Sequence, residues 1–307
     1  MPLQYRADID GLRAIAVLVV IFFHAGIPGF SGGFVGVDVF FVISGFLITS
    51  IILKEIKVGK FSVARFYERR IRRIFPALFP VIAFTLVVGA FLFDSNAFHA
   101  FGKSITATTL FISNILFWRE SGYFDPASIT KPLLHTWSLA VEEQFYIFFP
   151  LLLIAISRFA KNRYFPWLFV ICLFSLLISI YGAYTYQVAT FYLVPTRAWE
   201  LLFGSILALG VIPQLQSDLQ RNFFSIIGLG LISYSVLFYT EATLFPGANA
   251  LVPVMGASCI IYSGLAGGGS HQQVSQLQAY RVHRPHIILT LSLALASVCV
   301  CQVSSLP

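Results

Sequence analysis

Charged residues are scarce in this sequence. Only 11% of its 307 residues are Asp, Glu, Lys or Arg, whereas a water-soluble domain carries about a quarter. Apolar residues make up 58% of the chain, and the mean hydropathy is +0.83. These values exclude a water-soluble domain and predict a polytopic membrane protein.

Cysteine is also rare, and a processed leader is not evident. The first thirteen residues contain Asp8 and Asp10, and no small-residue cleavage site follows the first apolar stretch, which argues against a cleaved secretory signal. The cysteine spacing fits neither a zinc site nor an extracytoplasmic disulfide framework, so we assign these residues to packing and expect no metal site. All four lie in apolar stretches: Cys172, Cys259, Cys299 and Cys301.

The excess of positive charge carries topological information. A net charge of +7 is compatible with nucleic-acid binding in principle. The basic residues, however, crowd into a few short loops between apolar segments instead of forming one soluble basic surface. We therefore expect no nucleic-acid partner and use these residues to orient the chain in the membrane.

Apolar segments of spanning length, about 20 residues each, recur along the chain. We predict an all-α, polytopic transmembrane helix bundle of about 8 to 10 spans. The segment 100–118 is apolar too, but it carries Lys103, Asn114 and several hydroxyl residues, which leaves its crossing open. The eight clear segments are 14–30, 34–53, 75–93, 138–157, 165–186, 196–212, 223–240 and 248–265.

The loop after the second segment sets the orientation. It is strongly basic, and basic loops remain in the cytoplasm, so the N-terminus is predicted to be cytoplasmic as well. If segment 100–118 crossed, the loop with Arg158, Lys161 and Arg163 would face outward, against the same rule. We therefore predict residues 94–137 to be an extracytoplasmic excursion with a re-entrant or surface helix.

Arg13 and His24 bracket the apolar run from Ala14 to Phe23. Eleven residues at about 100° each make roughly three turns, so both side chains leave one helix on nearly the same face, about 16 Å apart. Ionisable groups are costly in a bilayer and normally face a protein interior or a water-filled cavity. The pair predicts a functional site with Arg13 at the cytoplasmic end; the alternative is an interfacial anchor and a capping or packing histidine.

A second polar group opens a later helix. Ser138 is expected to cap this helix, which places Glu142 near the end of the first turn, where the helix dipole favours negative charge. Glu143 projects about 100° away from Glu142, so the two carboxylates cannot serve one partner equally. We expect one to orient or balance a neighbouring group and the other to face a substrate hydroxyl as a general base.

Three further features have two interpretations each. Arg197 and Glu200 are spaced i, i+3, so they could pair with each other or contribute to a site. The glycines from Gly29 to Gly36, just before Asp38 in the second segment, permit close approach of the backbone either to another helix or to a ligand. The basic cluster Arg65 to Arg73 orients the chain and binds anionic lipid headgroups, or meets the phosphates of a soluble donor.

These stretches together resemble the membrane-bound acyltransferase family 3, which includes bacterial O-antigen and other polysaccharide O-acetylases. The resemblance rests on Tyr5 to His24, Gly33 to Gly45, Phe66 to Pro76 and Leu134 to Tyr146. Arg197 to Glu200 and Phe245 to Ala250 extend it to about residue 264.

The resemblance implies an O-acyltransferase of the bacterial inner membrane. It would take an acyl group, commonly acetyl from acetyl-CoA, in the cytoplasm and pass it to a hydroxyl of a glycan or lipid-linked sugar such as lipopolysaccharide O-antigen, with no permanently bound cofactor. His24 would be acyl acceptor or general base, Arg13 would hold the donor or stabilise charge, and Glu142 and Glu143 would tune the imidazole or the acceptor. The residues expected to bind donor or acceptor are Asp38, Arg72, Arg73, His135, Ser138, Arg197 and Glu200.

The chain changes character after Gly264. We expect residues 1–264 to form the acyltransferase-like transmembrane domain and 265–307 to form an atypical tail with one short apolar segment, Ile287 to Val300, and no soluble domain. The tail has no acidic residue and is biased towards Ser, Cys and Leu, which suggests a truncated or frameshifted reading frame and an inactive product.

The alternative function is a transporter or flippase of an acyl donor or glycan intermediate, which would use the same buried polar groups. Transporters often contain duplicated halves, and the Arg13 to His24 pattern is not repeated in the second half of the chain.

Overall fold

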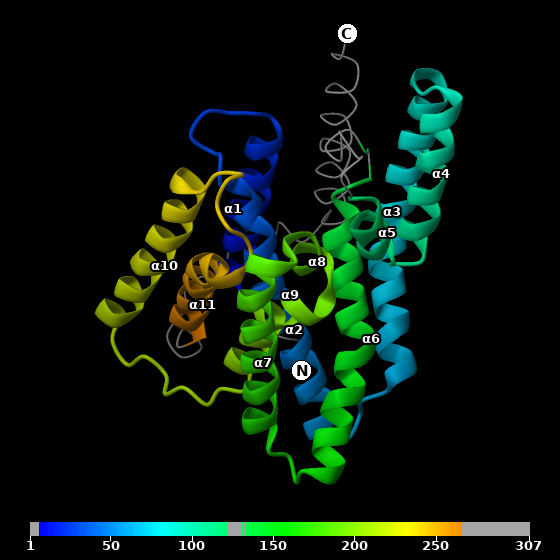
Figure 1. Ribbon diagram of the computed structural model, residues 1–307. Coiled ribbons are helices and arrows are strands. Elements are labelled where there is room, and N and C mark those ends of the chain that lie inside the picture. The colour runs from blue at the N-terminus through cyan, green and yellow to red at the C-terminus, as the bar shows by residue number, and fades with distance from the viewer. Residues whose placement is uncertain (1–5, 122–130, 132, 266–307) are drawn as a thin grey trace, which may run out of the picture. The chain divides into compact units, whose positions relative to one another are not determined.

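A computed structural model describes residues 6–121, 131 and 133–265. All regular elements in these ranges are helices, so the predicted all-α class is confirmed (Figure 1). Residues 266–307, which hold nearly all of the predicted tail together with Cys299 and Cys301, lie outside the described part. The elements are α1 (Ala7–His24), η1 (Gly33–Val35), α2 (Gly36–Lys57), α3 (Val63–Leu92), α4 (Ser95–Thr109), α5 (Ser113–Glu120), α6 (Thr136–Phe159), α7 (Tyr164–Thr185), α8 (Gln187–Tyr192), α9 (Val194–Ala208), α10 (Asp218–Phe238), η3 (Gly247–Ala250) and α11 (Leu251–Ser263).

The described helices form two compact units. The first unit holds α1, nearly all of α2, the larger part of α6 from Phe145 onward, and α7 to α11. The second holds α3, α4, α5 and the beginning of α6 up to Gln144. Each unit has its own buried residues.

A helix lies at each of the eight predicted apolar segments. Five helical stretches are long and apolar enough to cross a membrane: 33–57, 63–92, 136–159, 164–185 and 218–238. The others are shorter or more polar, because α1 carries Asp8, Asp10 and Arg13, while α9 and α11 have 15 and 13 residues.

The predicted excursion contains two helices instead of one. Helix α4 ends at Thr109, and α5 begins at Ser113. Between them Phe111 adopts a left-handed backbone conformation with φ of 54°. An L-residue in this conformation interrupts the helical hydrogen-bond pattern. Segment 100–118 is therefore divided between α4 and α5.

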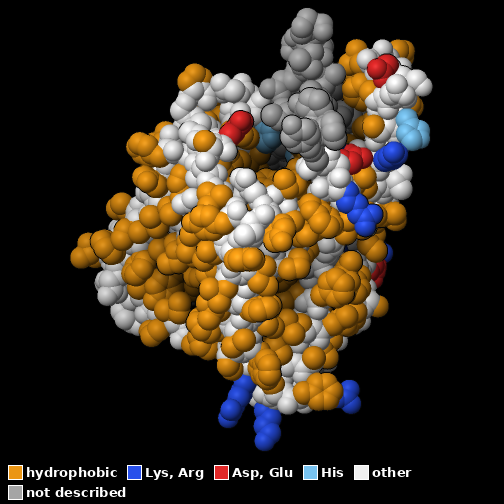
Figure 2. All heavy atoms as spheres, viewed as in Figure 1, with side chains coloured by type: hydrophobic (Ala, Val, Ile, Leu, Met, Phe, Trp, Pro, Cys, Tyr) orange, Lys and Arg blue, Asp and Glu red, His pale blue; other side chains and the backbone are white. Residues whose placement is uncertain are grey.

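The outer surface of α7 shows why these helices belong in lipid. Its buried residues form one stripe, including Leu168, Cys172, Ser175 and Ser179. Large apolar side chains on its other faces are exposed, among them Phe174 at 65% and Val170 at 60%. Hydrophobic side chains also cover most of the face drawn in Figure 2. Apolar side chains that face outward along a whole helix are stable in hydrocarbon but not in water.

Glycines set the closest helix contacts, as the sequence predicted for Gly33 and Gly36. A Cβ atom at either position would overlap a backbone carbonyl of α1, that of Val19 or that of Ala16. In α10 and α11, which lie side by side in Figure 1, a Cβ on Gly228 would lie 2.6 Å from the Gly256 carbonyl oxygen. Small residues let membrane helices approach to backbone contact.

The α2–α9 crossing gives a stability prediction. A Cβ at Gly204 would overlap the Val42 carbonyl oxygen, so Gly204→Ala is expected to destabilise the protein by about 1–3 kcal/mol, the usual cost of overpacking. Thermal unfolding of the purified protein in detergent measures the loss. The matched control is Gly230→Ala in α10, where a Cβ meets nothing within 4 Å and the transition is expected to stay or rise. Equal transitions for both variants would contradict the close crossing.

Candidate functional site

Helix α1 carries both residues of the predicted central pair. It buries Ile9, Leu12, Ala16 and Val19 along one stripe, and it leaves Arg13 and His24 half-buried. Arg13 Nη1 lies 3.4 Å from Asp10 Oδ1, and each of these side chains keeps 31% of its surface exposed. One continuous helix therefore joins the two residues, with His24 as its last residue.

The His24 imidazole is held on two sides. Its Nδ1 lies 2.8 Å from the Val20 carbonyl oxygen, one turn earlier in α1. The ring meets Phe23 edge to face, with centroids 5.1 Å apart and planes at 80°. Phe23 in turn contacts Phe34 at 5.6 Å, and Phe34 contacts Phe245 at 4.9 Å. An aromatic wall thus extends from the imidazole into the interior of the first unit.

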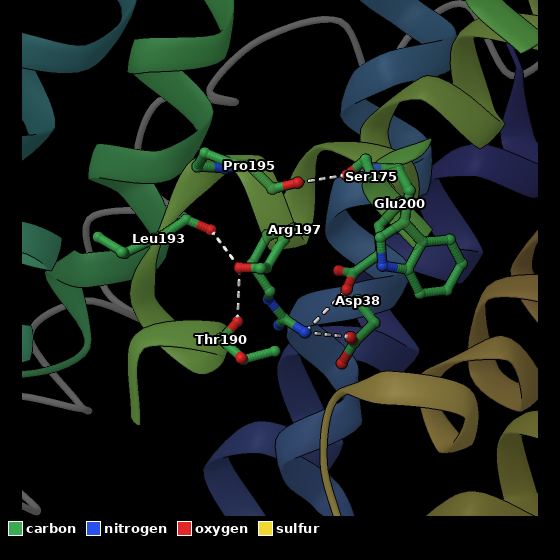
Figure 3. Close-up of polar contacts among 9 residues, drawn as sticks. Asp38, Ser175, Thr190, Leu193, Pro195, Arg197 and Glu200 are labelled. Atoms are coloured by element: carbon green, nitrogen blue, oxygen red, sulfur yellow. Dashed lines mark hydrogen bonds and ion pairs between the residues drawn. The ribbon is translucent and has the colours of Figure 1, made fainter. Parts of the chain in front are cut away.

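Arg197 lies at the centre of a buried ionic cluster in the same unit, between Asp38 of α2 and Glu200 of α9 (Figure 3). Its Nη1 is 3.1 Å from Asp38 Oδ1 and 2.8 Å from Glu200 Oε1. The relative side-chain exposure is 1% for Arg197 and 0% for both acids. The i, i+3 pairing, one of the two interpretations of this spacing, is present, and the cluster ties α2 to α9.

Aromatic rings close the cluster off. The Arg197 guanidinium carbon lies 5.3 Å from the ring centre of Phe41, and 5.7 Å from those of Phe191 and Phe245. Such distances fit cation–π contacts. The structure encloses the side chains of Asp38, Arg197 and Glu200. Their donor- or acceptor-binding roles stay predictions.

Two hydroxyl residues missed by the sequence reasoning fix the beginning of α9 (Figure 3). Ser175 of α7 donates to the Pro195 carbonyl at 2.6 Å and accepts from the Trp199 amide at 3.0 Å. Thr196 donates to the carbonyls of Leu193, at 2.8 Å, and Thr190, at 2.9 Å. These bonds position Arg197, which follows Thr196 directly. No residue spacing in the sequence indicates the bonds of Ser175, because Ser175 belongs to α7 and its partners to α9.

Glu143 is the most buried of the predicted acids in the second unit. Its residue exposure is 8%, and its Oε1 has no hydrogen-bond partner among the described residues. Arg70 and Arg73 of α3 lie close enough to attract its carboxylate, and Glu142 repels it. Glu142 is half-buried. The two adjacent carboxylates therefore have different surroundings, as their 100° separation predicts.

The predicted cap of α6 is wrong. Helix α6 begins at Thr136, so Ser138 lies inside it and donates to the His135 carbonyl at 3.2 Å. The reason is the Thr136 hydroxyl, which donates to the Leu133 carbonyl at 2.7 Å and contacts Ser113 of α5. Glu142 therefore lies beyond the first turn, where the helix dipole no longer accounts for a carboxylate. His135, the residue before α6, is half-buried.

Polar contacts also hold α5 on α6. Gln144 donates to Asn114 Oδ1 and to the Phe111 carbonyl, both at 2.8 Å. These contacts place the residue after Glu143 firmly against the α4–α5 turn. The second unit thus presents Glu143 from a helix whose beginning is fixed by hydrogen bonds.

The arginines expected at the donor site divide between two environments. Arg72 Nη2 pairs with Glu68 at 2.8 Å on an exposed surface, with 77% and 55% of the side chains accessible. Arg73 is exposed but close enough to act on Glu143. Arg70, which sequence reasoning did not select, joins Arg73 beside that carboxylate. Arg70 and Arg73 lie on the same side of α3 because residues three apart share one face of a helix.

Metal ligation has no candidate in the described ranges, where no group of three or more His, Cys, Asp or Glu residues could hold an ion. Cys172 is buried in α7 and its thiol points to the Trp199 carbonyl at 3.5 Å, in line with a packing role.

Comparison with known proteins connects this arrangement to a family. The family described as an acyltransferase domain matches residues 6–300. A protein of Haemophilus influenzae is 37% identical over 239 residues, which cover 74% of this chain and 97% of that protein. A Staphylococcus aureus (strain MSSA476) protein named as a proposed O-acetyltransferase is 38% identical over 247 residues. The peptidoglycan O-acetyltransferase OatA of Listeria monocytogenes is 36% identical over 212 residues.

The extent of these matches differs. The chain spans 40% of the length of the Staphylococcus protein and 34% of OatA, with 76% and 67% of its own residues aligned. No solved structure matches.

Proposed function

Because the chain belongs to the membrane-bound acyltransferase family 3 and is an O-acetyltransferase-like enzyme, we propose that it moves an acetyl group from cytoplasmic acetyl-CoA to a hydroxyl of an extracytoplasmic or lipid-linked glycan. The observation that carries this proposal is α1, which holds Arg13 and His24 on one helix with the imidazole half-buried at its end. Such a pair offers a cation for the donor and an acid–base group for the acceptor.

The relatives indicate only the class of molecule to which the acceptor belongs. OatA is named for peptidoglycan, and lipopolysaccharide O-antigen is the acceptor that the resemblance implies. Both are glycans of the cell envelope with free hydroxyl groups. We place the enzyme in the bacterial cytoplasmic membrane, with the basic loop from Lys54 to Arg73 on the donor side. Membrane lipids and acyl-CoA are then its partners.

His24 performs the transfer by one of two routes. As general base it takes the acceptor hydroxyl proton while the hydroxyl oxygen attacks the thioester carbon, the C–S bond breaks, and the thiolate takes the proton from the imidazole. As acyl carrier it attacks the thioester carbon first and the thiolate leaves, taking a proton from water. The acceptor oxygen then bonds to the acyl carbon as the C–N bond breaks, and the freed ring nitrogen takes the hydroxyl proton and releases it to water. Arg13 stabilises the negative charge that develops on the thioester oxygen.

The proposal is tested with membrane vesicles of both orientations and acetyl-labelled acetyl-CoA. We expect label on glycan when acetyl-CoA reaches the cytoplasmic face, and none when it reaches only the other face. Movement of unreacted donor or glycan across the membrane without ester formation would instead support the transporter alternative. In the absence of acceptor, label bound to His24 identifies the acyl-carrier route.

Glu143 gives a prediction for the same assay. Glu143→Gln keeps the shape of the side chain but removes the carboxyl group as a proton donor or acceptor beside Arg70 and Arg73, so we expect transfer to fall by roughly 10²-fold. Glu142→Gln, which alters a less buried carboxylate, is expected to cost less. The measurement is the initial rate at saturating acetyl-CoA.

The exposed Glu241 supplies the matched control, since Glu241→Gln is expected to retain the wild-type rate. A Glu143→Gln rate equal to this control, in protein with an unchanged unfolding transition, would remove Glu143 from the mechanism.

A further inference from the structure

The last turn of α1 holds a contact between the His24 imidazole and the helix backbone. Nδ1 of its ring lies 2.8 Å from the Val20 carbonyl oxygen. A carbonyl oxygen can accept a hydrogen bond but cannot donate one. The proton in this contact must therefore belong to Nδ1.

A neutral imidazole has one N–H group and one nitrogen lone pair. With the proton on Nδ1, the lone pair is on Nε2, the ring nitrogen farther from the helix backbone. Among the described residues, no side chain or carbonyl hydrogen-bonds Nε2, and the other contact of the ring is the Phe23 edge. The Nδ1 side of the ring is thus held by α1, while Nε2 has no hydrogen-bond partner among the described residues.

We propose that the Val20 carbonyl is the positioning group of His24, holding its proton on Nδ1 and making Nε2 the reacting nitrogen. This inference rests on the proposed acyl transfer and specifies the atom that performs it. Both routes use the same atom: as a base, Nε2 takes the proton of the acceptor hydroxyl, and as a carrier, Nε2 forms the bond to the acyl carbon as the C–S bond breaks.

The same contact stabilises the charged state that either route passes through. When Nε2 has gained a proton or an acyl group, the ring is positive and still donates from Nδ1 to Val20. Hydrogen bonds from a charged donor are stronger than neutral ones. His24 is also the last residue of α1, where the negative end of the helix dipole favours a cation. The carbonyl and the helix end therefore orient this imidazole and stabilise its charged form, as a carboxylate does in a catalytic triad.

This assignment also restricts the roles that the acids of the second unit can have in the reaction. Since Nδ1 is already hydrogen-bonded to Val20, Glu142 and Glu143 are not needed to orient the imidazole through that nitrogen. Their contribution then lies with the acceptor, the donor or the arginines of α3.

The tautomer is tested first by magnetic resonance on the full chain in lipid nanodiscs, with ¹³C- and ¹⁵N-labelled histidine. The His24 signals are identified by their loss in His24→Gln, and the spectra are recorded at a pH where the ring is neutral. We expect an Nδ1–H signal and an unprotonated Nε2. A predominant Nε2–H tautomer would overturn the proposal. This readout needs no activity, so it stands even if the wild-type protein transfers no acyl group and the proposed function fails.

The reacting atom is tested by two methylhistidines installed at position 24. A methyl group on Nε2 is expected to lower transfer to the His24→Ala level, a loss of about 10²–10⁴-fold. A methyl group on Nδ1 removes the Val20 contact but keeps the Nε2 lone pair, so this variant is expected to stay above that level. Thermal unfolding verifies that both proteins are folded. Equal rates for the two variants, or the reverse order, would overturn the assignment of Nε2.

Discussion

Replacement of His24 by alanine is expected to lower acyl transfer by about 10²–10⁴-fold, the usual contribution of a positioned acid–base group. The variant loses the only nitrogen that we assign to the reaction, yet the fold keeps its other contacts. The Val20 hydrogen bond that disappears is worth only about 0.5–1.5 kcal/mol. The measurement is the initial rate of label transfer to glycan in vesicles, at matched amounts of folded enzyme.

A second histidine makes the control specific. His99 in α4 is exposed, and His99→Ala is expected to retain the wild-type rate. Arg13→Lys keeps a positive charge but loses the planar donor group, so it is expected to lie between wild type and Arg13→Ala. Full transfer by His24→Ala would refute His24 as base and as acyl carrier alike.

How much of the fold the sequence predicts depends on how far apart along the chain the interacting residues lie. The helices at all eight apolar segments were predicted, because burial in lipid requires only a local run of apolar residues. The pairing of Arg197 with Glu200 is also local, since residues three apart share one helix face. Close helix contacts at Gly33 and Gly36 follow from the lack of a side chain.

The remaining features depend on contacts between distant residues. Asp38 reaches Arg197 across 159 positions, and no local pattern connects them. The false cap at Ser138 arose because Thr136 bonds to Ser113, 23 positions earlier, and starts α6 two residues sooner. The break at Phe111 was missed for a similar reason, since Gln144 of α6 bonds its carbonyl.

The ionic cluster gives the largest expected change in stability. Arg197→Met leaves Asp38 and Glu200 as two buried carboxylates with no cation from Arg197, and breaking such a cluster typically costs about 3–5 kcal/mol. We expect a much lower yield of folded protein and a lower unfolding transition in detergent. The control is Arg221→Met, whose partner Asp218 is 87% exposed and whose loss is expected to cost no more than about 1 kcal/mol.

A charge-neutral variant separates electrostatics from packing. In the triple variant Arg197→Met, Asp38→Leu and Glu200→Met the volumes stay close to the original, but no ionised group remains in the cluster. Replacement of a buried ion pair by apolar groups of similar size is often nearly neutral for stability, so most of the loss is expected to return. If the triple variant is as unstable as Arg197→Met alone, the guanidinium acts through its contacts with Phe41, Phe191 and Phe245. If stability returns but acyl transfer does not, the charges themselves serve the reaction, and the cluster joins His24 in the mechanism.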